Sequence, residues 1–312
     1  MSANGATDLV GGHPVISGGC DAEGWESLTS VHRTIGEEKE RAAMKDTVHG
    51  FRQVDQATDP QYYFQFLDEL SMLRSVQECR DLMLEMLGIR PGHQLLDIGC
   101  GVGDEVRAMA RLAGATGKAV GLDNSQAMIA EATRRSEGSG LSVEFLVGNA
   151  EHLEFASESF DGCRSERTFM YLDAGRALDE MIRVTKPGGS LVVFDLDHDG
   201  ISIDSSQPAL TRRLAQFLSD NHRNGIVGRH LMRLFKERGL TDLTFKPHSL
   251  ICPFSFFSRL YSRILIKAQQ AGAITPTEST EWFSEMVEAD KRGVFLMVVP
   301  GFIVSGRKPW QS

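Results

Sequence analysis

The sequence has few cysteines and none of the cysteine spacings that mark a disulfide framework or a zinc knuckle. Five cysteines are scattered through the 312 residues, and no two of them form a CxxC pair. An odd number of widely separated cysteines is typical of proteins from a reducing compartment. We therefore expect a cytoplasmic protein without disulfides and without a metal site.

Long hydrophobic runs are also missing. No stretch reaches the roughly eighteen consecutive apolar residues that a membrane-spanning helix needs. The first residues, MSANGATDLVGG, contain neither the basic region nor the apolar region of an export signal. The sequence therefore predicts no spanning membrane segment and no export.

Positive charge is in deficit. Lys and Arg total 33 against 42 Asp and Glu, so the formal net charge is -9. A surface that binds nucleic acid usually carries an excess of positive charge, and we expect no nucleic-acid partner. The rest of the composition, 41% hydrophobic and 24% charged, is ordinary for a globular protein that can bury a core.

Three segments differ in composition. Residues 1–20 are rich in glycine and poor in apolar side chains, and we expect a flexible tail there. Residues 21–89 contain a mixed-charge segment, predicted as a short surface helix. From Pro60 onward, apolar residues at spacings of three and four predict amphipathic helices. Gly88 ends this predicted helical lid, and residues 90–312 form the main domain.

Beyond the lid, short apolar runs alternate with helical periodicity, and Ser125 and Asp173 are predicted to begin two of the helices. Short bounded apolar runs are expected of parallel strands buried on both faces. The alternation predicts an α/β fold with a doubly wound, mostly parallel sheet. Helical inserts are expected at about 200–230 and 255–292. The predicted strands are 94–98, 118–123, 141–148, 159–164, 190–196, 241–254 and 295–308.

The strongest local signal is LLDIGCGVGDEV, in which a buried strand runs into Gly99, Gly101 and Gly103 before a helix begins. Glycines at such a turn let the backbone approach a ligand closely. Asp123 follows Gly103 by 20 residues, at the end of the next strand, where a carboxylate can accept both ribose hydroxyls. Asp104 replaces the third glycine of a dinucleotide fingerprint and would repel a diphosphate. The loop therefore favours an adenosine cofactor without phosphates.

Four motifs occur in order along the chain: LLDIGCGVG, GLDNS, GNAEHLEF and RVTKPGGSLVVFD. Together they resemble the motifs of class I S-adenosylmethionine-dependent methyltransferases, over residues 90–200 and the closing strands. Among subfamilies, the chain most resembles small-molecule enzymes related to the ubiquinone and menaquinone C-methyltransferases. The resemblance implies a Rossmann-like, seven-stranded sheet with an antiparallel edge hairpin. It also implies S-adenosylmethionine as the cofactor and S-adenosylhomocysteine as its product.

The resemblance assigns cofactor contacts residue by residue. Asp97 would orient the glycine loop, the three glycines would contact the methionine moiety, and Asp123 would hold the ribose. Taken singly, the polar residues also fit the capping of turns. Their order favours binding, because open parallel sheets hold ligands at the carboxyl ends of their strands. The predicted cofactor-binding residues are Asp97, Gly99, Gly101, Gly103, Asp123, Asn124, Asn149, Ala150, Ser165 and Tyr63.

The remaining assignments concern the adenine, the sulfonium and the lid. Asn124 would contact the adenine face, and Asn149 and Ala150 the adenine amine. The family more often has Asp at the position of Asn149, but an amide can still accept from the amine. Ser165 would lie near the sulfonium. Tyr63 would close over the cofactor, although aromatic residues at helical spacing more often serve packing.

Methyl transfer needs a nucleophile held close to an activated carbon, and only some acceptors require a base. His198, after the fifth predicted strand, is the first choice as base because the pKa of histidine suits proton transfer. Asp195 is a further catalytic candidate. A hydrated acidic loop is the alternative for this stretch. Arg167 would bind a carboxylate or phosphate, or pair with Glu166.

These observations predict transfer of a methyl group to an O, N or C atom of a small, partly apolar organic molecule, for example in secondary metabolism. The alternatives are a cyclase that binds the same cofactor and a binding subunit that keeps the fold without catalysis. A dinucleotide oxidoreductase ranks third because of Asp104. The amphipathic segment 254–267 fits a hydrophobic pocket first, a homodimer contact second and a membrane surface third.

Overall fold

A computed structural model describes residues 50–57 and 59–310 of the protein. These residues all lie within the larger of two units of the chain, residues 43–312. The tail predicted at residues 1–20, the surface helix predicted after it and the first part of the predicted lid lie outside the described residues. The described residues cover the second half of the predicted lid, except residue 58, and the predicted main domain up to residue 310.

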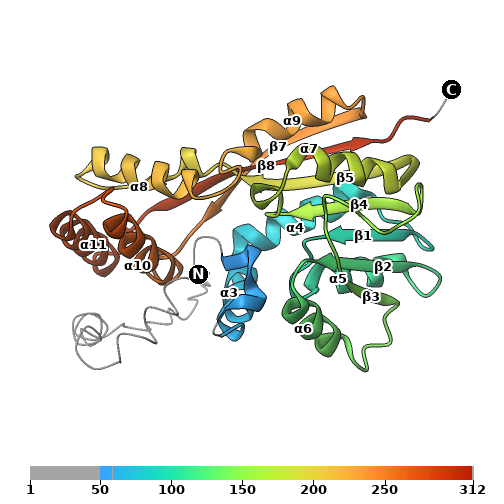
Figure 1. The fold of residues 1–312 in the computed structure, drawn as a ribbon, viewed down its shortest axis with the longest axis horizontal. Helices are drawn as coiled ribbons and strands as arrows, with labels where there is room; N and C mark the ends of the chain where they lie inside the picture. Colours follow the sequence, from blue (N-terminus) through green and yellow to red (C-terminus); the bar gives the residue numbers. More distant parts are fainter. Residues whose placement is uncertain (1–49, 58, 311–312) are drawn as a thin grey trace, which may run out of the picture. The chain divides into compact units, whose positions relative to one another are not determined.

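The parallel part of the sheet forms as predicted (Figure 1). Its four strand pairings are all parallel, in the order β3-β2-β1-β4-β5, so the direction of strand addition reverses between β1 and β4. Four of the five strands are buried along most of their length, as strands covered on both faces must be. The strands are β1 Gln94–Ile98, β2 Lys118–Asp123, β3 Val143–Val147, β4 Phe160–Glu166 and β5 Thr185–Leu196.

Three helices connect the parallel strands: α5 Asp104–Ala113, α6 Gln126–Ser136 and α7 Ala174–Val184. Two of them begin where the sequence predicts. The side chains of Ser125 and Asp173 each accept a hydrogen bond from the backbone N–H three residues further on, at 3.1 and 3.2 Å. These caps satisfy N–H groups that have no partner within the helix.

The sheet ends in the antiparallel part that the resemblance implies. β8, Met297–Arg307, pairs with β5, and β7, Thr241–Ile251, pairs with β8 along most of its length. The sheet has eight strands rather than the predicted seven, because the two-residue strand β6, Ser202–Ile203, also pairs with β8. This short strand leaves the predicted fold class unchanged.

The residues Pro187, Gly188 and Gly189, which precede the strand predicted at 190–196, lie inside a strand. β5 already begins at Thr185, and its register against β4 breaks over these residues. Gly188 has a φ of 75°, and its N–H donates to the Lys308 carbonyl at 2.8 Å instead of to β4. The Pro-Gly-Gly signal therefore marks a bulge in β5 rather than its beginning.

Helices from both ends of the described chain meet near the carboxyl ends of the strands. Phe66 on α3 packs against Phe256 on α10, with ring centroids 5.1 Å apart, and Gly88, with a φ of 64°, ends α4 as predicted. None of the helices within the described residues is long and apolar enough to cross a bilayer. The bounds are η1 Gly50–Arg52, η2 Val54–Gln56, α3 Gln61–Met72, α4 Arg74–Leu87, η3 Phe169–Tyr171, η4 His198–Gly200, α8 Pro208–Asp220, α9 Val227–Glu237, α10 Phe254–Gln270 and α11 Pro276–Lys291.

Gly103 provides a test of how tightly α5 packs on the sheet. Its φ is 81°, and a Cβ at this position would stand 2.6 Å from the Phe145 ring and 3.0 Å from Ala132. Gly103→Ala should lower the free energy of unfolding by about 3 kcal/mol, from backbone strain and overpacking together. Gly138→Ala is the matched control, because Gly138 has a φ of 69° and no neighbour within 4 Å. Gly138→Ala should lower the free energy of unfolding only by the backbone strain, about 1 kcal/mol. Equal losses of unfolding free energy for the two variants in urea would contradict the packing account.

Candidate functional site

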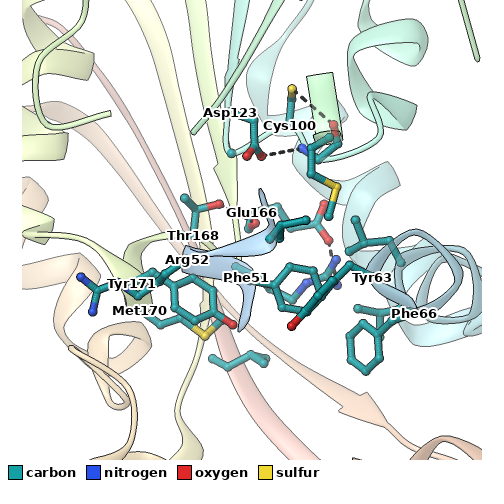
Figure 2. Close-up of a pocket in the computed structure, with 18 of the residues that line it drawn as sticks. Phe51, Arg52, Tyr63, Phe66, Cys100, Asp123, Glu166, Thr168, Met170 and Tyr171 are labelled. Carbon is teal, nitrogen blue, oxygen red and sulfur yellow. Dashed lines mark hydrogen bonds and ion pairs between the residues drawn. The ribbon is translucent and has the colours of Figure 1, made fainter. Parts of the chain in front are cut away.

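A cavity of about 660 Å³ lies at the carboxyl ends of the parallel strands. Its walls come from the loops after β1 to β4, from the segment before α3, and from α10, β7 and β8. Figure 2 shows Asp123 and Glu166, which end β2 and β4, around the same space as Phe51 and Tyr63. The cavity therefore lies where the strand order reverses, which is where open α/β sheets bind ligands.

The glycine loop forms part of the cavity wall, but its three glycines differ in role. Gly99, Gly101 and Gly103 all have left-handed φ values, of 75°, 51° and 81°. Gly99 and Gly101 line the cavity. Gly103 does not, and its missing Cβ is explained by the close approach of Phe145. The predicted methionine contact of Gly103 is therefore replaced by a role in helix packing.

Asp123 ties the glycine loop to the start of α6. One carboxylate oxygen accepts from the Gly101 N–H at 2.9 Å and the other from the Ser125 N–H at 3.0 Å. Burial raises the pKa of Asp123, and these main-chain bonds oppose the rise. Asn124, next to it, lines the cavity and donates its amide N–H to the Arg52 carbonyl at 3.2 Å. Because each carboxylate oxygen has a second lone pair, Asp123 can still accept from a ligand.

The predicted adenine and lid residues also reach the cavity. Asn149 and Ala150 line it after β3, and the Asn149 side-chain oxygen accepts from the Glu151 N–H at 2.8 Å. Asn149 thus caps a turn and faces the cavity at once. Tyr63 is 2% exposed and lies edge-to-face with Phe51, with centroids 5.0 Å apart. Its packing role and its position in the cavity wall therefore coexist.

Six charged side chains form a buried cluster beneath the glycine loop. Arg164 on β4 is at its centre, with one guanidinium nitrogen 2.7 Å from Glu166 and another 3.4 Å from Asp97. Asp97 therefore contacts an arginine rather than the loop that it was predicted to orient. Three arginines face three carboxylates, and all six line the cavity. The members are Arg80, Asp97, Glu105, Arg164, Glu166 and Arg167.

Burial and charge act in opposite directions within this cluster. Burial raises the pKa of Asp97 to about 7, because Arg164 only partly offsets the loss of water. Burial would also raise the pKa of Glu166, but Arg167, Arg80 and Arg164 together hold it well below its usual range. At neutral pH, Glu166 is therefore the firmly ionised acid of the cluster, whereas Asp97 is poised between its two forms.

Sequence reasoning missed three members of the cluster, Arg80, Glu105 and Arg164. The signal was present at the end of the strand predicted at 159–164, where Arg164 is a charged residue in a strand predicted to be buried. Buried charges are costly unless they are paired. Arg164 therefore required acidic partners, and Asp97 pairs with it in register across β1 and β4. The other partners come from helices that the sequence pattern could not place.

Besides Gly103, two further predicted site residues lie outside the cavity. Ser165 is fully buried in the sheet, and its hydroxyl donates to the Ile98 carbonyl at 2.9 Å instead of facing a sulfonium. Asp195 is also fully buried, and its carboxylate accepts the N–H groups of Met170 and Leu196 at 3.1 and 2.8 Å. Burial raises the pKa of Asp195 to about 7. Asp195 holds η3 against the end of β5 and is corrected from a catalytic to a structural role.

Arg167 lines the cavity in a strained conformation. Its φ is 53°, a value that residues other than glycine rarely adopt. Its backbone N–H donates to the Phe194 carbonyl at 2.8 Å. Its guanidinium lies 2.9 Å from a Glu166 oxygen. Of the two roles that the sequence left open, pairing with Glu166 is the one formed in the structure.

His198 lines the cavity from η4 and is only 7% exposed. Its Nδ1 lies 3.2 Å from the Gly225 carbonyl, so Nδ1 carries the proton and Nε2 is the acceptor. The ring stacks on His222, with centroids 4.3 Å apart and an interplanar angle of 11°. Burial and His222 lower the pKa of His198 to about 3. The loop is therefore not the hydrated acidic stretch of the alternative reading, and the imidazole is neutral at physiological pH.

The acidic residues of the site are paired with arginines. Within residues 50–57 and 59–310, no group of three or more His, Cys, Asp or Glu is arranged to hold a metal ion. In the same part of the chain, the four cysteines are free and buried. Besides the cluster around Arg164, the charged residues on the cavity wall are Asp123, Arg52, Asp104 and Glu151.

The half of the cavity farthest from the glycine loop is apolar. Side chains from the end of β5, the helical inserts and the antiparallel strands line it, and the imidazoles of His198 and His222 are polar groups among them. This half is formed largely by segments beyond residue 196. Its apolar lining consists of Leu196, Ile201, Leu218, Leu250, Cys252, Phe256, Leu260, Met297 and Val299.

Residues 96–193 match the family described as methyltransferase domain. A demethylmenaquinone methyltransferase of Bacillus velezensis is 31% identical over 181 residues, which cover 54% of this chain and 72% of the relative. The methyltransferase GfsG of Streptomyces halstedii is 32% identical over 158 residues, which cover 50% of this chain and 53% of the relative. The chain spans about half the length of the Streptomyces relatives that it matches.

The fold is shared with a solved bacterial structure. The YcgJ protein of Bacillus subtilis superposes with a TM-score of 0.55 at 18% identity, over 75% of this chain and 100% of that protein. At this identity, the superposition shows a common fold and no more. It is consistent with the Rossmann-like sheet that the resemblance implied.

The neutral state of His198 can be tested through the pH dependence of stability. In the unfolded chain its pKa returns to about 6.5, so acid favours the unfolded state as the pH falls below that value. Between pH 7 and pH 5, this one group should lower the free energy of unfolding by about 2 kcal/mol. His198→Phe should remove that part of the loss in urea titrations. Identical losses in wild type and variant would contradict the burial of a neutral imidazole.

Proposed function

We propose that this protein, which belongs to the class I S-adenosylmethionine-dependent methyltransferases, transfers a methyl group from S-adenosylmethionine to a small, partly apolar organic molecule. The observation that carries the proposal is the division of the cavity. Polar groups at the ends of the parallel strands line one half, and apolar side chains of the inserts and antiparallel strands line the other. A nucleoside cofactor and an apolar acceptor fit these two halves.

S-adenosylmethionine is the cofactor of this family, and the ends of β2 and β3 suit its nucleoside half. Asp123 would accept the ribose hydroxyls on lone pairs that its main-chain bonds leave available. Asn124 would lie against the adenine, and Asn149 and Ala150 would contact the adenine amine. Tyr63 would cover the cofactor from α3. All five side chains line the cavity, which supports this placement.

The methionine half would lie over the glycine loop. Gly99 and Gly101 allow the main chain to approach a ligand there, because neither has a side chain on the cavity wall. The cluster below the loop supplies charges of both signs, from Arg80 and from Glu105 and Glu166. Such a pair of charges suits the ammonium and carboxylate of an amino acid.

A phosphate-bearing cofactor fits the same loop poorly, although not for the reason that the sequence offered. Asp104 forms an ion pair with Arg107, so its charge is compensated within α5. Two other acids, Glu105 and Asp123, also line the cavity beside the loop. Several carboxylates at the start of α5 would oppose a diphosphate at this helix end. The exclusion therefore rests on the set of acids and not on Asp104 alone.

The chain's part in the transfer is to hold the acceptor near the reactive carbon and to keep water away. S-adenosylmethionine supplies a methyl group already activated on a sulfonium. The apolar half of the cavity excludes water around it. His198 offers a neutral Nε2 acceptor that can take a hydrogen bond from the substrate and serve as the base for an acceptor that needs one. Arg167, held by Glu166, acts as a positioning residue rather than as an anion-binding one.

An apolar acceptor is also supported by the relatives. The Bacillus velezensis relative is named for demethylmenaquinone. A small molecule with an apolar ring or chain fits the lining formed by Phe256, Leu260 and their neighbours. The methyl-accepting atom is an O, N or C atom of that molecule, and an intact-mass gain of one methyl group identifies the transfer. A cyclase would leave the substrate mass unchanged, and a binding subunit would give no product.

The cofactor assignment can be tested by isothermal titration with S-adenosylhomocysteine. The wild-type protein should bind it saturably. Asp123→Asn should weaken binding about 100-fold, because two charge-assisted hydrogen bonds to the ribose would be lost or weakened. Absence of saturable binding to the wild-type protein would remove the proposed function.

The matched control for this titration is Asp179→Asn. Asp179 lies on α7, pairs with Arg238 and does not line the cavity. The Asp179→Asn variant should bind S-adenosylhomocysteine as the wild type does. Thermal unfolding of both variants separates a lost contact from a lost fold, because only a local loss leaves the melting temperature of Asp123→Asn close to that of the control.

A further inference from the structure

A short segment ahead of the first long helix forms one wall of the cavity. We call Gly50–Gln56 the strap; it consists of the two single-turn helices η1 and η2. Phe51, Arg52 and Val54 of the strap line the cavity, on the side where β2 ends. Figure 2 shows Phe51 beside Tyr63 at this wall. A ligand in the cavity would therefore touch the strap directly.

Asp55 fastens the strap to the start of α6. Its carboxylate accepts a hydrogen bond from the Ser125 hydroxyl at 2.6 Å and from the N–H groups of Gln126 and Ala127 at 2.8 and 2.9 Å. The first N–H groups of a helix have no partner within the helix, and a carboxylate is favoured there by the helix dipole as well. One side chain from the strap thus satisfies three donors of the main domain.

Two weaker attachments hold the strap in the same place. Asn124 donates to the Arg52 carbonyl at 3.2 Å. Val54 is 1% exposed and packs in a small apolar cluster that is separate from the main core of the protein. The other members of that cluster are Tyr63, Phe64, Val102 and Met128. Releasing the strap would therefore break side-chain attachments and this small cluster, while the main core stays intact.

We infer that the strap acts as a latch, a segment that closes over the nucleoside half of the cofactor. The hydrogen bonds from the start of α6 to Asp55 hold the strap closed, so cofactor exchange requires Asp55 to release α6. The inference rests on the proposed function for the identity of the ligand. Asp55 is a positioning residue, since it touches Ser125 and α6 rather than the cavity. The other walls are the loops after β1 to β4, strands and long helices. The strap packs in the small cluster outside the main core, so it can open while the main core stays intact.

Closure and binding then stabilise each other. A ligand that contacts Phe51, Arg52 and Val54 binds the closed strap more tightly than the open one and shifts the strap toward closure. By linkage, a variant that lowers the fraction of closed strap weakens the apparent affinity of the ligand in proportion to that fraction. The end of β2 meets the start of α6 at this point, where the Ser125 N–H donates a hydrogen bond to the Asp123 carboxylate. The latch therefore acts on the residue proposed to hold the ribose.

Stopped-flow binding of S-adenosylhomocysteine to the full chain tests the latch. Asp55→Ala should raise the dissociation rate about tenfold or more, because a helix cap and its charge-assisted bonds are lost. The association rate should rise or stay the same, because the strap is open more often. 5′-Methylthioadenosine, which keeps the nucleoside and lacks the amino acid, should show the same change. The control is Asp59→Asn, next to the strap. The Asp59 carboxylate accepts from the Gln61 N–H at 3.0 Å, at the start of its own helix, and this variant should match the wild type.

A second variant loosens the strap without touching α6. A Cβ on Gly50 would stand 2.0 Å from the Tyr63 hydroxyl, so Gly50→Ala should keep the strap from seating. It should raise the dissociation rate in the same direction as Asp55→Ala. If only Asp55→Ala had an effect, the cause would be disturbance of α6 and not release of a latch, and the inference would be overturned.

Limited trypsin digestion gives a readout that is independent of affinity. Arg52 is the basic residue of the strap, and cleavage after it reports the open state by mass spectrometry. S-adenosylhomocysteine should protect this bond in the wild type and protect it less in Asp55→Ala. If the wild type bound S-adenosylhomocysteine but both strap variants kept the wild-type dissociation rate and the wild-type protection from trypsin, the latch would be overturned. The proposed function would then still stand. Failure of the wild type to bind would instead remove the proposed function.

Discussion

The carboxylate of Asp123 accepts one main-chain hydrogen bond from the glycine loop after β1 and another from the start of α6. These two bonds fix the relative positions of three pieces of chain at the point where the strand order reverses. Glycine adopts the left-handed conformations of Gly99 and Gly101 without strain, and the bond from the Gly101 N–H to Asp123 fixes the loop in place. The same carboxylate is the group best placed to meet a ribose, so the fold and the proposed binding site share one constraint.

Beneath that loop, the cluster around Arg164 sets the electrostatics of the cavity floor. Three arginines and three carboxylates are taken out of water together, which is tolerable because each charge has a partner. A buried network of this kind is weak evidence for stability, since apolar residues of similar volume usually serve as well. Its place on the wall of the cavity is the feature that links it to ligand binding. The raised pKa of Asp97 shows that the compensation is incomplete.

The cavity is closed by segments that are far apart in the chain. Glu69 on α3 forms an ion pair with Arg259 on α10, and the guanidinium of Arg263 lies over the Tyr62 ring at 3.8 Å from its centroid. The ring contact between Phe66 and α10 adds to these. The N-terminal helices and the late helical insert thus form one cover over the ends of the strands. The parallel sheet supplies the floor, and this cover supplies part of the apolar lining, together with α8 and the antiparallel strands.

Local sequence determined the parallel strands, the crossover helices with their caps at Ser125 and Asp173, and the left-handed loop at Gly99 and Gly101. Each of these depends on residues within one short stretch, whose periodicity or backbone freedom is visible in the sequence itself. The family motifs add the order of the strands and the cofactor. Local patterns therefore indicated the half of the cavity that is proposed to bind the nucleoside.

Only the tertiary structure decided which side chains face that cavity. Ser165 and Asp195 lie at strand ends where the motifs predict function, yet their polar atoms form hydrogen bonds with neighbouring main-chain groups. Arg80 and Asp55 come from segments without a motif and reach the site because packing brings α4 and the strap beside it. The reason is physical: a hydrogen bond or an ion pair depends on distance in space, and sequence spacing fixes that distance only within a single element.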